Sequence, residues 1–171
     1  MTKKILLIHK CIIVAAILIL STSCSNTGND IEPEKLGKVN LIANKQAYEN
    51  AESNRENGTG NELSDPFSIE SVERIGNILK VKVTYTGGCE KHTFDLLWNE
   101  VVILTYPCQI NLILTHNANG DKCEAQITEI IEIDLDEFIS GGEYTTTCNL
   151  NVFSVLNGSD NPDGIVTSTG D

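Results

Sequence analysis

Apolar and polar residues alternate with a period of two through much of the second half of the chain. The run Ile78–Tyr85 is the clearest case, because its odd-numbered residues are apolar or aromatic and its even-numbered residues after Ile78 are Lys or Thr. Such alternation is typical of a half-buried β-strand. A Gly76-Asn77 pair separates this run from a second one that begins at Phe67. The pair predicts a two-residue β-hairpin.

Similar short runs recur along the chain, separated by turn residues. Further strands are predicted at 39–43, 93–98, 101–106, 110–116, 123–135, 144–155 and 165–167. Many short strands with frequent turn signals and almost no helical period are typical of β-sandwiches and barrels. The sequence therefore predicts an all-β, single-domain, antiparallel β-sandwich of Ig-like or related type, with a barrel as the alternative.

Residues 44–65 differ from the rest, because they are rich in Asn, Glu, Ser and Gly and have few apolar residues. Such a composition predicts a loop, here with one helical turn near Gln46–Glu52. The expected boundaries are a flexible tether over residues 24–65 and a sandwich domain over residues 66–171.

The first 23 residues have the three parts of a secretory signal. Lys3, Lys4 and Lys10 form a basic segment, residues 11–20 are all apolar, and three small residues then precede Cys24. An uncleaved membrane anchor is the alternative, but ten apolar residues are too few to cross a bilayer, which needs about 20. The sequence predicts a signal peptide that ends at Ser23.

The segment Leu20-Ser-Thr-Ser-Cys24 resembles a bacterial lipobox, with its Leu one place earlier than usual. The resemblance implies that Cys24 becomes the first residue and carries acyl chains, including palmitate. Several acyl chains hold a protein stably on a membrane. We therefore expect an exported protein anchored to the bacterial outer membrane or the cell surface.

The chain is acidic, with a net charge of −12. Loss of the three signal-peptide lysines leaves nine Lys and Arg against 24 Asp and Glu, so the mature charge is −15. Such a chain repels phosphate backbones, which excludes nucleic acid as an expected partner. It also lacks a basic patch for anionic lipids, so the lipid on Cys24 is the expected membrane contact.

Four cysteines remain beyond the signal peptide and the lipidated Cys24. They are Cys89, Cys108, Cys123 and Cys148. An even number in an exported chain predicts two disulfides, and three connectivities are open. Zinc is the alternative, but its sites usually need closely spaced cysteines. We favour Cys89 with Cys123, since both lie beside turns, and Cys108 with Cys148.

The two mature histidines, His92 and His116, each lie near a cysteine and a turn. If folding brings them together with Asp121 or Glu124, they form a transition-metal site. The alternative is that each histidine hydrogen-bonds within a turn or the core. His116 falls on the inward side of its strand, which favours a core histidine.

A second candidate metal site is the spacing Asn117-x-Asn119-x-Asp121, because alternate oxygen side chains in a tight turn can bind calcium. The EF-hand pattern is not met, since Gly120 precedes Asp121. Asn, Gly and Asp are also the usual residues of hairpin turns, which is the simpler interpretation. No cofactor is therefore expected, with calcium as the exception to test.

No set of residues predicts catalysis. The cysteines are expected to be oxidised, no G-x-S-x-G motif occurs, and carboxylate pairs among 24 acids are uninformative. Trp98, the single tryptophan, is expected in the core rather than on a sugar-binding surface. The sequence thus predicts that the protein is not an enzyme.

The segments Gly87-Gly-Cys-Glu-Lys-His-Thr-Phe94 and His116–Ala125 resemble those of small uncharacterised lipoproteins from Bacteroidetes-type bacteria. The resemblance implies an envelope location and no known activity. We expect a non-enzymatic structural or ligand-binding accessory whose partner is an envelope protein or a glycan. A metal-binding envelope lipoprotein is the first alternative, and a small secreted hydrolase is the second.

Overall fold

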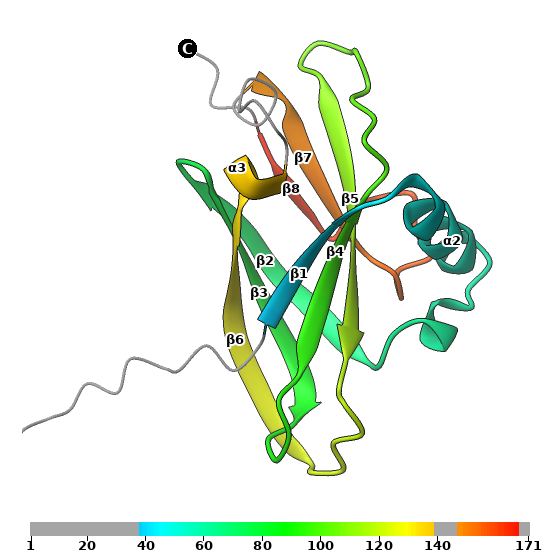
Figure 1. The fold of residues 1–171 in the computed structure, drawn as a ribbon, viewed down its shortest axis with the longest axis vertical. Coiled ribbons are helices and arrows are strands. Elements are labelled where there is room, and N and C mark those ends of the chain that lie inside the picture. Colours follow the sequence, from blue (N-terminus) through cyan, green and yellow to red (C-terminus); the bar gives the residue numbers. More distant parts are fainter. Residues whose placement is uncertain (1–37, 139–146, 168–171) are drawn as a thin grey trace, which may run out of the picture. The chain divides into compact units, whose positions relative to one another are not determined.

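The computed structural model describes residues 38–138 and 147–167 (Figure 1). The strands are β1 (Lys38–Ala43), β2 (Phe67–Ile75), β3 (Ile78–Gly87), β4 (Thr93–Trp98), β5 (Gln109–Asn117), β6 (Ala125–Asp134), β7 (Asn149–Ser154) and β8 (Gly164–Val166). The helices are α2 (Lys45–Glu56), the short 3₁₀ helix η1 (Gly60–Glu62) and α3 (Leu135–Phe138). The predicted signal peptide, Cys24 and the first part of the predicted tether lie outside the described residues.

The strands form two sheets that pack face to face (Figure 1). One has five strands in the order β1-β4-β5-β7-β8, and the other has three in the order β2-β3-β6. This confirms the predicted single-domain, disulfide-bonded sandwich. Two strand pairs, β1 with β4 and β5 with β7, are parallel, which differs from the all-antiparallel pairing that we expected. Between each parallel pair the chain crosses to the three-stranded sheet, and parallel neighbours require such long connections.

The main core lies between the sheets. In β3 the predicted inward residues Leu79, Val81, Val83 and Tyr85 are all buried. They pack against Phe94, Leu96 and Trp98 of β4 and the inward residues of β5, β6 and β7. The predicted hairpin is confirmed, since Ile75 pairs with Ile78 and Gly76 adopts a φ of 58° between them.

A second, smaller core covers the outer face of the five-stranded sheet. Leu97, Ile113 and Phe153 point outward from β4, β5 and β7 and pack against Tyr48 and Ala51 of α2. Asn44 caps the N-terminus of helix α2, because its side-chain oxygen accepts a hydrogen bond from the Ala47 N–H at 2.9 Å. Figure 1 shows α2 on the side of this sheet that faces away from β2, β3 and β6.

The predicted domain boundary at residue 66 is therefore wrong. The strand predicted at 39–43 is present as β1, but it belongs to the sheet and not to a tether. Residues 44–65, expected to be a loop with one helical turn, supply a 12-residue helix and η1. The physical reason is that α2 needs few apolar side chains. Buried Tyr48, Ala51 and Arg55 follow one another at intervals of three and four residues, which places them on one helix face.

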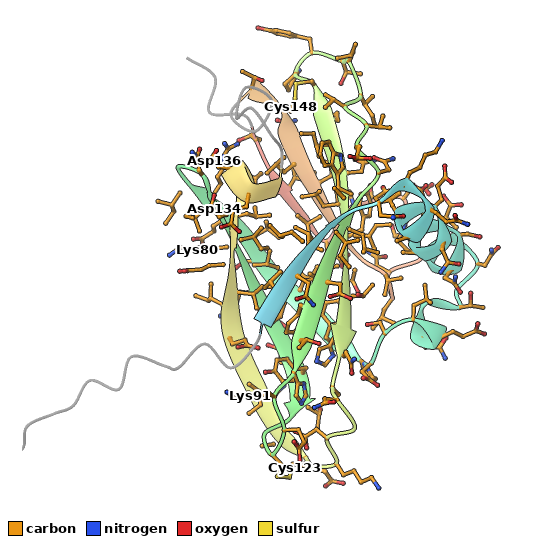
Figure 2. All side chains as sticks on the ribbon, viewed as in Figure 1. Lys80, Lys91, Cys123, Asp134, Asp136 and Cys148 are labelled. Atoms are coloured by element: carbon orange, nitrogen blue, oxygen red, sulfur yellow. A yellow bond between two sulfur atoms is a disulfide. The ribbon has the colours of Figure 1, made fainter. Side chains whose placement is uncertain are left out.

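Two disulfides close the ends of the sandwich, and both pairings match the prediction. Cys89–Cys123 joins the β3–β4 connection to the β5–β6 connection, and Cys108–Cys148 joins the starts of β5 and β7. Since Cys108 precedes β5 and Cys123 follows it, the two bonds lie at opposite ends of that strand (Figure 2). Cys148 is fully buried, as its predicted inward position requires.

No helix in residues 38–138 and 147–167 has the length and apolar character needed to cross a membrane.

Candidate functional site

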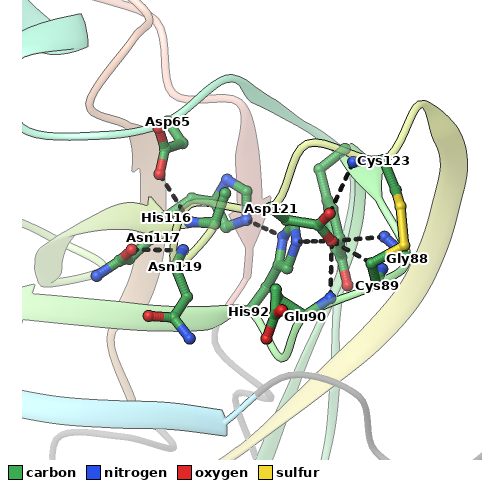
Figure 3. Close-up of polar contacts among 12 residues, drawn as sticks. Asp65, Gly88, Cys89, Glu90, His92, His116, Asn117, Asn119, Asp121 and Cys123 are labelled. Atoms are coloured by element: carbon green, nitrogen blue, oxygen red, sulfur yellow. Dashed lines mark hydrogen bonds and ion pairs between the residues drawn. A yellow bond between two sulfur atoms is a disulfide. The ribbon is translucent and has the colours of Figure 1, made fainter.

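Three side chains are hydrogen-bonded in a row at the end of the sandwich that the Cys89–Cys123 disulfide closes (Figure 3). They are Asp121, His92 and His116. His92 Nε2 lies 3.1 Å from Asp121 Oδ2. His92 Nδ1 lies 2.8 Å from His116 Nε2. Each side chain comes from a different part of the sequence, and we call the group the Asp–His–His chain.

The local fold explains why these residues meet. His116 lies on β5 and pairs across the sheet with Phe94 of β4, so its side chain points into the sandwich. His92 immediately precedes β4, and Asp121 lies in the turn between β5 and β6. The segment before β2 fixes the His116 backbone, because Ser64 Oγ accepts its N–H at 2.9 Å and the Asp65 N–H donates to its carbonyl at 2.9 Å.

The Asp121 carboxylate is held by backbone donors. Its Oδ2 accepts hydrogen bonds from the N–H groups of Gly88, Cys89 and Glu90 at 2.8–3.0 Å, and its Oδ1 accepts one from Cys123 at 2.8 Å. These N–H groups, chiefly those of Glu90 and Cys123, hold the pKa of Asp121 well below its usual range. The carboxylate is therefore ionised, and a ring of backbone N–H groups neutralises part of its charge.

Both histidines are buried among aromatic rings. Tyr85 stacks on His92 with ring centroids 4.4 Å apart, and Phe94 stacks on His116 at 4.7 Å. The rings of Phe67 and Tyr85 also lie within 5.6 Å of His116. Only 2% of His92 and 3% of His116 is exposed, so no substrate reaches either imidazole from solvent in this conformation.

The hydrogen bonds link the three side chains in series. The ionised Asp121 carboxylate accepts from His92 Nε2–H, and one hydrogen bond joins His92 Nδ1 to His116 Nε2. His116 Nδ1 has no hydrogen-bond partner among the described residues. Burial lowers the pKa of His116, and the His92 ring lowers it further, whereas the backbone and carboxylate of Asp65 oppose the shift. His116 is accordingly neutral at neutral pH.

The structure brings together three of the six residues named for the predicted metal sites, and Glu124 is exposed outside this group. His92, His116 and Asp121 form a line in which both His92 nitrogens already have partners, rather than three ligands around one point. Asn117 and Asn119 lie outside it in the exposed turn, where Asn117 Oδ1 accepts the Asn119 N–H at 2.7 Å. This hydrogen bond is that of an ordinary turn, which was the simpler interpretation of the Asn117-x-Asn119-x-Asp121 spacing.

Within the described residues, one group has three potential metal-ligand atoms within 4.8 Å of one another, namely Cys89, Asp121 and Cys123. Its two sulfur atoms are bonded to each other. They therefore offer no thiolate to a metal while the disulfide is intact.

A polar hollow of about 280 Å³ lies on the outer face of β4 and β5, beside η1. Its acidic residues are Glu62, Asp65 and Asp95, but two of them already have partners. Asp65 accepts the Ala118 N–H at 2.7 Å, and Asp95 accepts the Asn40 amide at 2.7 Å. The sequence does not predict this hollow, because the pattern of Thr93, Asp95 and Thr115 indicates only the polar side of two strands.

Two further contributors to the site were also missed. The first is Tyr85, which stacks on His92 and whose hydroxyl donates to Glu129 at 2.8 Å. The second is Gly87, since a Cβ at this position would lie 2.5 Å from two atoms of the His92 ring. The signal in the sequence for Gly87 is the Gly87-Gly88 pair, which by itself indicates only a break in the β pattern.

Comparisons with known proteins find resemblance at the level of structure. No family model matches the chain, and no curated protein matches it. A protein of unknown function, DUF1344, from Bacteroides vulgatus is 15% identical with a TM-score of 0.43, covering 70% of this chain and 51% of that one. A NigD-like immunity protein from Bacteroides caccae is 16% identical with a TM-score of 0.43, covering 69% and 51%.

A third solved structure, a putative toxin-related protein from Parabacteroides distasonis, is 15% identical with a TM-score of 0.41, covering 69% of this chain and 54% of that one. The chain thus spans about half the length of each of these structures. The likeness is one of fold, and no functional residue is transferred from these proteins.

Proposed function

We propose that this chain is an exported, lipid-anchored binding protein of a bacterial envelope that performs no catalysis. The signal peptide and the Leu20–Cys24 segment support export and anchoring at Cys24. The strongest support from the structure is the pair of disulfides, which uses all four cysteines beyond Cys24. Disulfides persist in oxidising compartments outside the cytoplasm.

The Asp–His–His chain supports a structural rather than a catalytic role for the two histidines. A general base must reach a substrate proton within hydrogen-bond distance. Both ring nitrogens of His92 already have hydrogen-bond partners, Asp121 and His116, and aromatic rings cover His116. In this proposal the Asp–His–His chain fixes the end of the sandwich, and the protein binds its partner through its surface.

Fractionation of cells that express the full chain tests the anchor. Cys24→Ala should move the protein from the membrane fraction to the soluble fraction of the envelope, because it removes the acylated thiol. Cys11→Ala is the matched control, since Cys11 leaves with the signal peptide, and it should stay with the membrane. Membrane retention of the Cys24→Ala protein would contradict the proposal.

Thermal melts of the purified full chain test the metal-binding alternative. A metal at 100 times its dissociation constant stabilises the folded state by about 2.7 kcal/mol. Melting in EDTA, in calcium and in zinc should give the same midpoint if the proposal holds. A rise with one ion that is lost in Asp121→Asn or His116→Gln would replace the proposal with a metal-binding function.

A further inference from the structure

The connection between β4 and β5, residues 99–108, is a loop where a strand was predicted over 101–106, and it presents large apolar side chains to solvent. Leu104 is 85% exposed and Tyr106 is fully exposed, and Val101 and Ile103 are each nearly half exposed. Figure 1 shows this connection, which we call the β4–β5 loop, projecting past the ends of the strands that it joins. Apolar side chains that are exposed together mark an interaction surface, whereas apolar side chains that are exposed singly are ordinary.

The β4–β5 loop is held in one conformation by its own hydrogen bonds. The N–H of Ile103 donates to the Gln109 carbonyl, and the N–H of Gln109 donates back to the Ile103 carbonyl, both at 2.9 Å. Thr105 Oγ1 donates to the Pro107 carbonyl at 2.8 Å. These bonds hold the segment from 103 to 109 as a closed turn around the exposed Leu104 and Tyr106.

The base of the loop is fixed to the core. Trp98 Nε1 donates to the Val101 carbonyl at 3.2 Å, and Val102 packs against the main core. At the other end, the Cys108–Cys148 disulfide ties the loop to the start of β7. A loop that is already ordered loses little conformational entropy on binding, so its apolar side chains are preorganised for a partner.

The direction of the loop separates it from the place where the tether enters the domain. β1 runs parallel to β4, with Lys38 beside Thr93 and Ala43 beside Trp98. The chain therefore enters the sandwich at the Thr93 end of β4, whereas the loop leaves from the Trp98 end. The loop therefore leaves the sandwich at the end opposite Lys38, the first described residue, and in the proposed function, on which this inference rests, Cys24 precedes Lys38 and carries the anchor.

The negative charge of the loop and of the whole chain favours a protein partner with basic residues. The loop contains Glu100 and no Lys or Arg, and the whole chain has a net charge of −12. Segments that lie on membranes combine apolar with basic side chains, so this loop lacks half of that combination. A second copy of this chain would bring together two bodies of the same negative charge.

We propose that the β4–β5 loop is the docking site for another envelope protein, which receives Leu104 and Tyr106 in an apolar pocket bordered by basic residues. Tyr and Leu side chains in a pocket exclude water from a binding interface, and Tyr is among the residues that dominate binding energy at interfaces. The acidic surface of the sandwich accelerates the encounter with a basic partner.

Site-specific photo-crosslinking in cells that express the lipid-anchored full chain tests this docking site. A photoreactive residue at position 104 or 106 should give one discrete protein adduct. The same residue at Ile75 or Ile165, which are exposed apolar positions on β2 and β8, should not. Untagged wild-type chain expressed in the same cells should lower the adduct yield, and an untagged Leu104→Ser/Tyr106→Ser chain should leave it unchanged.

Two further measurements test whether the partner is basic and whether the variant protein is folded. In isolated envelopes the adduct yield should fall as the salt concentration rises, because salt screens the attraction of a basic partner. The Leu104→Ser/Tyr106→Ser protein should melt at the wild-type temperature, since both side chains are exposed. Adducts only to lipid, adducts only to a second copy of the chain, or equal yields at all four positions would each overturn the inference.

Failure of the anchor and failure of the docking site are distinguishable. If Cys24→Ala changes nothing in fractionation while positions 104 and 106 still give the specific adduct, the lipid anchor is wrong and the docking site is right. If Cys24→Ala releases the protein but positions 104 and 106 behave like 75 and 165, the docking site is wrong and the anchor is right.

Discussion

His92 and His116 share a hydrogen bond of 2.8 Å between Nδ1 and Nε2, although 24 residues separate them along the chain. The bond joins the segment between β3 and β4 to the last part of β5, at one end of the sandwich. It continues through His92 Nε2 to the buried side chain of Asp121. Protonation of His116 and of Asp121 is therefore coupled to folding.

The stability of the protein should fall as the pH drops below about 6.5. The pKa of His116 is lowered from 6.5 in the folded state, so the unfolded chain binds the proton more tightly. Its contribution is complete above pH 6.5 and is lost as the pH falls below that value. Urea unfolding from pH 8 to pH 4 measures this, and His116→Gln should flatten the dependence between pH 6.5 and 4. An unchanged slope in that variant would show that another group titrates.

Asp121→Asn should remove a second, more acidic transition. Because hydrogen bonds lower the pKa of Asp121 from 3.8, its contribution is present above pH 3.8 and is lost as the pH falls below it. The amide also places an N–H₂ or a neutral oxygen against donors that now face a carboxylate. The variant should melt lower than wild type at pH 7 and lose less stability below pH 4. Asp136→Asn is the matched control, because it makes the same substitution at an exposed carboxylate in α3, which follows the other end of β6.

Gly87→Ala should destabilise the fold by about 1–3 kcal/mol, the usual cost of overpacking. The added Cβ would lie 2.5 Å from two atoms of the His92 ring and 2.9 Å from Asp121 Oδ2. Chemical unfolding measures the free-energy change. Gly158→Ala serves as the control, because the nearest atom to a Cβ there is the Arg55 carbonyl oxygen at 3.4 Å. Equal effects in the two variants would contradict the packing at His92.

Removal of either disulfide should lower the free energy of unfolding by about 2–4 kcal/mol. The two bonds span 34 and 40 residues, so double alanine variants at Cys89/Cys123 and at Cys108/Cys148 should lose similar amounts. Only the Cys108/Cys148 variant should loosen the β4–β5 loop, which hydrogen exchange would detect. Thiol titration that found four free cysteines in the native protein would show that the bonds are not formed.

Arg55→Met should destabilise the fold by about 1–2 kcal/mol, because it removes a buried charged donor but keeps the apolar stem. Arg55 Nη1 donates to the carbonyls of Asn157 and Ser159 at 3.2 and 2.5 Å, and the guanidinium lies 4.7 Å from the Phe153 ring centroid. Lys45→Met on the same helix, where the lysine side chain is 71% exposed, should change little. Thermal melts of both variants decide the comparison.

Local patterns predicted the β2–β3 hairpin and the disulfides. The alternation in β3 and the Gly76-Asn77 turn are properties of adjacent residues, and inward-facing Cys148 follows from the parity of its strand. The meeting of His92, His116 and Asp121 was also predicted, as one of two alternatives. Their arrangement in a line was not, because it depends on how Tyr85 stacks on His92 and Phe94 stacks on His116 in the folded core.

The five-stranded sheet shows what alternation alone cannot predict. Leu96, Leu97 and Trp98 are apolar in succession, as are Leu112, Ile113 and Leu114. Such runs are typical of strands buried on both faces, and here the second face packs against α2. Parallel pairing of β1 with β4 depends on which strands share a sheet, and no adjacent residues encode it.

The parallel pairing of β1 with β4 has a mechanical consequence. β1 is an edge strand and lies outside the segments closed by either disulfide, so hydrogen bonds and packing alone hold it. A pull on Lys38 from the N-terminal side, opposed at the Trp98 end of β4, would act along both strands in opposite directions. That force shears all six residue pairs at once instead of opening them one by one. A domain tethered in this way resists detachment under tension better than one whose first strand could be peeled from the edge.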